Sequence, residues 1–99
     1  MRNATLVMVL LLAACRVDDE KVQRADSPEA GRTEQSVRAH AGPPSRTIPA
    51  DSTCKERGGV RIIAYDASFV VLGREFKDRS VEFCIDVSGS IKNTTYVQY

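Results

Sequence analysis

The chain has no tryptophan, a single histidine and almost no excess of charge of either sign, with 14 Lys and Arg against 13 Asp and Glu in 99 residues. The balanced charge excludes the strongly basic surface with which nucleic-acid-binding proteins displace counterions. His40 is the only candidate for the proton transfer that histidine performs near neutral pH. Glycine-rich phosphate loops, metal-ligand spacings and nucleophile elbows are also missing from the sequence. We therefore predict a protein that is not an enzyme and that holds no cofactor or metal.

Long apolar runs are missing too, apart from one at the start that is too short to span a membrane. The run 4–14 covers eleven residues, whereas a spanning helix needs about 20. It follows a positively charged start and ends in two alanines, after which charged residues arrive at once. This order is typical of a secretory signal peptide. We predict that residues 1–14 form a signal helix that is removed on export.

The end of this run carries a second motif. Leu12-Ala13-Ala14-Cys15 resembles the lipobox of bacterial lipoproteins. The resemblance implies that diacylglycerol is joined to Cys15 Sγ, that a peptidase cuts between Ala14 and Cys15, and that the new amino group is open to acylation by palmitate. Two or three acyl chains anchor a protein durably. In Gram-negative lipoproteins an aspartate directly after the lipidated cysteine often favours retention in the inner membrane. This chain has Arg16 there, which favours the outer membrane facing the periplasm. An ordinary cleaved signal without lipidation is the alternative.

Three cysteines leave one thiol over in an exported chain. If lipid occupies Cys15, then Cys54 and Cys84 are the remaining pair. A disulfide between them suits the compartment that the signal implies, closes a loop of about 30 residues and adds roughly 3 to 4 kcal/mol of stability. Two reduced thiols with a redox or metal role are the alternative, but no CxxC motif or histidine cluster supports it.

The segment from residue 16 to about residue 51 is poor in large aliphatic side chains and contains no aromatic one. Prolines and glycines interrupt it. Such a composition buries too little apolar surface to offset the entropy of ordering the chain. We predict that residues 15–52 form a lipidated N-terminus and a disordered tether, in which His40 is solvated.

The remainder, 53–99, has the pattern of a small β domain. Short runs rich in β-branched residues alternate with turn signals, and a charged loop is expected over 74–79. The predicted fold is mainly β, with a small antiparallel sheet of about four strands within residues 59–99, tied by the disulfide. The expected strands are 60–65, which breaks at Asp66-Ala67, then 68–72, 80–87 and 91–99.

The hairpin 80–99 is the clearest element of this domain. Its first strand alternates, with one apolar face and one face that carries the cysteine. Ser88-Gly89 is expected to form the turn. The disulfide would then cross the less apolar side of the sheet. The apolar face holds Val81, Phe83, Ile85 and Val87, and the other face holds Glu82, Cys84 and Asp86.

Two groups of side chains are candidates for chemistry or recognition. Glu82 and Asp86 point the same way along one strand and are candidates for a pair of acid–base carboxylates; solubilising residues on an exposed sheet face are the commoner explanation. Tyr65, Tyr96 and Tyr99 are candidates for a recognition patch, with cross-strand packing as the alternative.

The stretch 81–93 resembles the strand–turn–strand unit that opens the C-terminal domain of TonB-type energy transducers. An alternating strand there runs into an Asp-x-x-Gly turn, here Asp86 to Gly89, and a second strand. The family continues with a helix and a further strand, so the resemblance implies that the domain is incomplete in this chain. A lipid-anchored N-terminus also departs from a transducer's membrane span.

These features predict a lipid-anchored protein of the bacterial cell envelope with a non-enzymatic binding or structural role. Its expected contacts are the membrane, through Cys15, and a protein or cell-wall partner, which exposed strand edges would pair with. A truncated or decayed fragment of a larger periplasmic domain is the alternative. A second alternative is a small envelope enzyme that uses surface carboxylates. Such an enzyme would require titratable groups clustered in a pocket.

Overall fold

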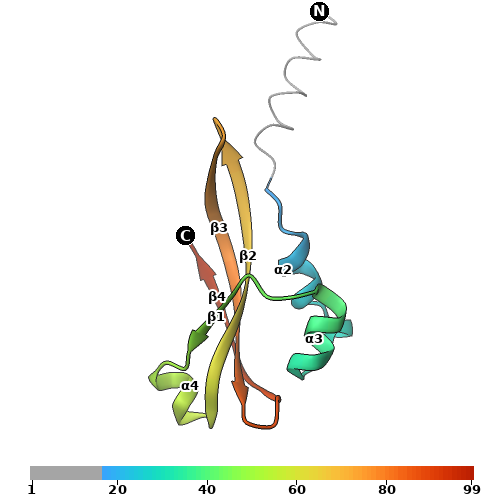
Figure 1. The fold of residues 1–99 in the computed structure, drawn as a ribbon, viewed down its shortest axis with the longest axis vertical. Helices are drawn as coiled ribbons and strands as arrows, with labels where there is room; N and C mark the ends of the chain where they lie inside the picture. The colour runs from blue at the N-terminus through green and yellow to red at the C-terminus, as the bar shows by residue number, and fades with distance from the viewer. Residues whose placement is uncertain (1–16) are drawn as a thin grey trace, which may run out of the picture.

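The computed structural model describes residues 17–99, which form one open sheet of four antiparallel strands in the order β1-β2-β3-β4 (Figure 1). The mainly β fold predicted from the sequence is confirmed. Ala14 and Cys15, with the predicted signal and lipidation, lie outside the described residues. The strands are β1 (Arg46–Pro49), β2 (Gly59–Val71), β3 (Arg74–Asp86) and β4 (Ile91–Gln98).

The strands are longer than their sequence patterns indicate. The two runs expected on either side of Asp66-Ala67 join into β2, and the break becomes a register shift between Ala67 and Ser68. The charged segment 74–79, predicted as a loop, is the first half of β3. That prediction is wrong because a strand needs only backbone partners, and β2 supplies them while the charged side chains remain in solvent.

The predicted disordered tether is also wrong over the part that the structure describes. Residues 17–51 are ordered and supply β1 as an edge strand of the sheet. Two helices of this segment pack on one face of the sheet (Figure 1). The helical elements are α2 (Glu20–Ala25), η1 (Pro28–Ala30), α3 (Glu34–Ala41) and, after β1, α4 (Ser52–Glu56).

Small apolar residues explain how so polar a segment folds. Each turn of helix places one or two of these small side chains against the sheet. The short side chain of alanine lets the helix backbone come close to the sheet. Thr33 and Ser36 form a capping box that starts α3. The composition therefore understates the core, because few residues are apolar but five of them are buried together in the main core. The buried ones are Val22, Ala25, Ala30, Val37 and Ala41.

The main core lies between these helices and the sheet. Tyr65 is fully buried there, packs edge-on against Phe83 with ring centroids 6.3 Å apart, and donates a hydrogen bond of 2.7 Å to the Gly42 carbonyl. The predicted apolar face of β3 is confirmed for Val81, Phe83 and Ile85. It is wrong for Val87, which is exposed because β3 ends one residue earlier.

The opposite side of the sheet, which we call the open face, is covered only in part, by α4. A small second core lies under this helix and consists of Ala50, Cys54, Ile62 and Cys84, with Ile48 against it. Beyond it the open face is polar. The open-face residues used below are Arg46, Asp66, Ser80, Glu82, Asn93, Thr95 and Tyr99.

Candidate functional site

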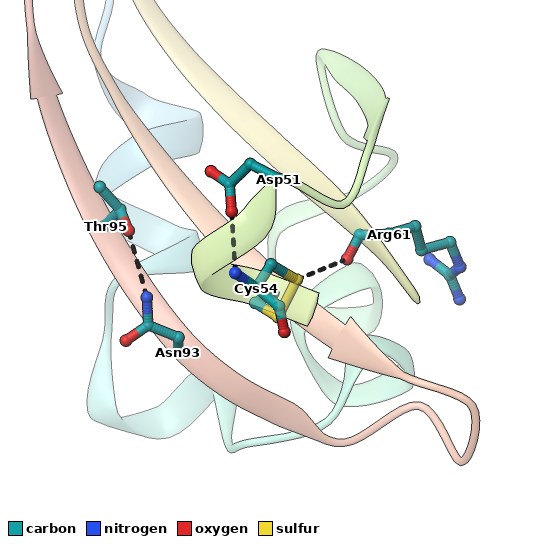
Figure 2. Close-up of a disulfide and its surroundings, with 6 residues drawn as sticks. Asp51, Cys54, Arg61, Asn93 and Thr95 are labelled. Atoms are coloured by element: carbon teal, nitrogen blue, oxygen red, sulfur yellow. Dashed lines mark hydrogen bonds between the residues drawn. A yellow bond between two sulfur atoms is a disulfide. The ribbon is translucent and has the colours of Figure 1, made fainter. Parts of the chain in front are cut away.

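A disulfide joins Cys54 of α4 to Cys84 of β3 on the open face (Figure 2). The Cα atoms are 5.5 Å apart and the two residues are 30 positions apart in the chain. The pairing predicted from the sequence is therefore present, and it crosses the side of the sheet that was expected. Both cysteines are buried, which fits a structural bridge better than a reactive one.

Two local features place α4 over this bridge. Asp51 begins the helix, since its Oδ1 accepts a hydrogen bond of 2.8 Å from the Cys54 backbone N–H. Gly59 leaves room for the sulfurs, because a Cβ there would lie 2.1 Å from Cys84 Sγ and 2.2 Å from Cys54 Sγ. Sequence reasoning missed this role of Gly59, because it depends on two sulfur atoms that only the fold brings next to it.

A cavity of about 270 Å³ opens beside the disulfide. Its walls come from α4, from the middle strands and from β4, where Asn93 Nδ2 donates a hydrogen bond of 3.4 Å to Thr95 Oγ1 (Figure 2). The disulfide and Ile62 form its apolar part. Its polar lining consists of Asp51, Thr53, Glu82, Asn93 and Thr95.

A network of charged and hydroxyl groups adjoins this cavity on the open face. Arg46 binds Asp66 with two hydrogen bonds of 2.9 Å, from Nε and Nη2. Ser80 Oγ also donates to Asp66. Burial raises the pKa of Asp66, but the hydrogen bonds from Arg46 and Ser80 outweigh it and hold that pKa below its usual range. Tyr99 Oη lies 3.4 Å from Arg46 Nη2 and closes the network.

Glu82 connects the network to the cavity. Its carboxylate lies 3.7 Å from Arg46 Nη2 and also lines the cavity wall. The side chain is mostly covered, with 18% of its surface exposed. A ligand in the cavity would thus meet a carboxylate whose charge is only loosely paired.

The structure does not join Glu82 and Asp86 into one acid–base pair. Asp86 serves the β3–β4 turn instead, where its Oδ1 accepts hydrogen bonds of 2.9 Å from the backbone N–H of Ser88 and of Ser90. The hydrogen bond from the Ser88 side chain, together with these, holds the pKa of Asp86 at about 2. The turn predicted at Ser88-Gly89 is confirmed, with Gly89 at φ +88°.

The three tyrosines do not form one patch. Tyr65 is in the main core. Tyr96 lies on the helix-covered side, where it donates a hydrogen bond of 2.7 Å to Asp26. Tyr99 belongs to the open-face network. His40 lies in the last turn of α3, and its side chain is partly exposed.

Within residues 17–99 no group of three or more His, Cys, Asp or Glu side chains is placed to hold a metal ion. In the same part of the chain no helix is long and apolar enough to cross a membrane. Comparisons with protein-family models, with curated proteins and with solved structures find no match to this chain.

Proposed function

We propose that this chain is a lipid-anchored protein of the bacterial cell envelope that binds a protein or cell-wall partner, without catalysis, on the open face of its sheet. The lipobox ending at Cys15 supports the anchor. The Cys54–Cys84 disulfide agrees with an oxidising compartment such as the periplasm. The outer membrane remains the favoured location because Arg16 follows Cys15.

The observation that carries the binding role is the cavity beside the disulfide. The bridge ties α4 to β3, and β2 and β4 pair with β3, so the walls are joined before a ligand binds, which lowers the entropic cost of binding. Two carboxylates, an amide and hydroxyls line it, and acceptors dominate this set. A ligand that donates hydrogen bonds suits it, such as the ammonium or amide N–H groups of a peptide, whether from a protein or from a wall polymer.

Mass spectrometry of the mature protein from native membranes tests the anchor. We expect loss of residues 1–14, added acyl mass on Cys15, and a gain of two hydrogen atoms on reduction. A Cys15→Ser variant is the control and should carry no acyl chain. An unmodified Cys15 in a soluble wild-type product would contradict the lipoprotein assignment.

Photo-crosslinking in cells tests the cavity. A photoreactive benzophenone amino acid replaces Thr95 in the cavity wall or, as the control, Gln98 at the far end of β4, which faces the other side of the sheet. We expect an adduct of higher mass from position 95 and none from position 98. Its composition would separate a protein partner from a wall polymer, and equal or absent adducts at both positions would reject the cavity as the binding site.

A further inference from the structure

The β2–β3 hairpin extends beyond the rest of the sheet and ends in apolar side chains. β1 pairs with β2 only up to Ala64, and β4 pairs with β3 only as far as Arg79. The end of the hairpin therefore projects past both edge strands (Figure 1). Phe69 and Phe76 stack there with ring centroids 5.6 Å apart. The exposed apolar side chains of this tip are Val70, Val71, Leu72 and Phe76.

Leu72 is the residue that the fold explains least. It is fully exposed and has φ +51°, and with Gly73 at φ +75° it forms the two-residue turn between the paired Val71 and Arg74. Turns with two such residues favour Asn, Asp or Gly at the first position. A leucine there adopts a costly backbone conformation and gains no buried contact within residues 17–99. Contact with an apolar surface outside this chain would explain why leucine occupies this position.

The N-terminal end of the described chain is fastened beside this tip. Asp18 and Ser68 exchange two backbone hydrogen bonds, of 2.7 and 3.0 Å, in an antiparallel bridge. In such a bridge the chain before Asp18 and the chain after Ser68 leave in the same direction. Val17 packs against the main core and so secures this exit. The first described residues accordingly lie along the projecting half of the hairpin (Figure 1).

Chain lengths then relate the tip to the lipidation position. Cys15 is three residues before Asp18, so it lies at most about 10 Å from that residue. Leu72 is four residues after Ser68, which is about 13 Å along a strand. An acylated Cys15 and the apolar tip are therefore both within about 13 Å of the same bridge.

We propose that the tip of the β2–β3 hairpin inserts Val70, Val71 and Leu72 into the membrane surface beside the acylated Cys15. The inference rests on the proposed lipid anchor. Apolar side chains at an exposed turn suit the boundary between headgroups and acyl chains. Arg74 lies over the Phe76 ring at 5.6 Å and would face lipid phosphates at headgroup depth. Lipid anchor and tip then hold the sheet upright, with α4 and the disulfide cavity toward the periplasm.

The absence of tryptophan makes this orientation measurable. The acylated full-length protein carries either L72W at the tip or, as a matched control, V87W at the exposed β3–β4 turn, which lies at the other end of the sheet. Both are reconstituted into vesicles of phosphatidylethanolamine and phosphatidylglycerol with brominated acyl chains. We expect blue-shifted, strongly quenched emission from L72W and unquenched, water-like emission from V87W. The mass of the same samples reports their acylation.

Each other outcome overturns the inference in a distinguishable way. Acylated L72W protein with unquenched, water-like emission would reject the inserted tip while the anchor stands. A blue shift without quenching by bromine would mean that a protein surface, such as a second copy of this chain, covers the tip. Equal quenching of both variants would mean that the sheet lies flat. Protein without acyl mass would refute the anchor and, with it, this inference.

Discussion

At the scale of single residues, Gly59 is packed closely against the disulfide. Gly59 has an ordinary backbone conformation, so its role is to leave space rather than to permit a special turn. Its neighbour Gly58 has φ +85°, a conformation that favours glycine, but a Cβ added there would have no atom within 4 Å. An alanine substitution at Gly59 therefore tests a steric effect on stability, and one at Gly58 tests a backbone effect.

Gly59→Ala should lower the free energy of unfolding by about 1 to 3 kcal/mol, because the added methyl group overlaps both sulfurs and α4 must move. Urea denaturation of the oxidised protein measures this loss. Gly58→Ala is the control and should cost about 1 kcal/mol through its backbone alone. If the two losses are equal in the oxidised protein and both persist after reduction, the contact with the sulfurs is not the cause.

Glu34 is the residue that ties α3 to the sheet by charge. Arg61 of β2 donates two hydrogen bonds to its carboxylate, one of them 2.7 Å long, and Arg38 donates a third of 2.9 Å. The hydrogen bonds from Arg61 and Arg38 hold the pKa of Glu34 at about 2, against the desolvation that raises it. Because this pKa is lower in the folded state than in the unfolded state, the ionised Glu34 stabilises the fold fully at pH values above its unfolded-state pKa. That stability is lost as the pH falls toward its folded-state pKa.

Glu34→Gln should therefore destabilise the protein by about 1 to 2 kcal/mol at pH 7, a figure reduced for the partial exposure of Arg61. The difference from the wild type should shrink as the pH falls from about 4.5 to about 2. Urea unfolding at several pH values measures it. A difference that stays constant down to pH 2 would show that packing, and not charge, is responsible.

At the scale of elements, the β2–β3 hairpin carries a conflict between stability and its proposed membrane contact. Backbone pairing continues to Val71 and Arg74, yet the turn between them uses a leucine in the left-handed region. Natural proteins retain such local costs where function requires them.

Leu72→Asn should raise the free energy of unfolding of the non-acylated protein by about 1 kcal/mol, because asparagine tolerates positive φ better than leucine. Thermal or urea unfolding measures the gain. Leu72→Ala is the control, since it removes the apolar side chain but keeps most of the backbone cost, and it should change stability little. A loss of stability in Leu72→Asn would indicate that Leu72 makes contacts within the protein.

At the scale of the whole molecule, the helices before β1 and the sheet form one folding unit. The helix-covered face of the sheet carries large side chains that α2 and α3 shield from water. Burying each stabilises the fold by about 1.5 to 3 kcal/mol. Four of them together approach the entire stability of a small domain, about 5 to 15 kcal/mol. These four are Ile63, Tyr65, Val81 and Ile85.

A fragment of residues 53–99, the domain that composition alone suggests, should therefore fail to fold even with its disulfide formed. Dispersion of amide resonances in an NMR spectrum measures this, with residues 17–99 as the folded control. A cooperative unfolding transition in the fragment, close to that of the longer chain, would show that the helices are dispensable.

The sequence by itself determined the local features of this protein. Alternation along 80–87 identified the second half of β3 and, except for Val87, its two faces. Ser88-Gly89 identified the turn, and the count of cysteines paired Cys54 with Cys84. Each of these depends on neighbours in the chain or on simple covalent arithmetic. The lipobox at Cys15 is equally local and stays a prediction.

Only the tertiary structure decided which sparse residues make a core. Ala25, Ala30 and Ala41 are weak signals in a sequence, but the fold gathers them into one core with the large side chains of the sheet, and no local pattern encodes that shared burial. The disulfide cavity depends in the same way on α4, β3 and β4 meeting in space. The bridge between Asp18 and Ser68 joins residues fifty positions apart, and no local pattern encodes that contact.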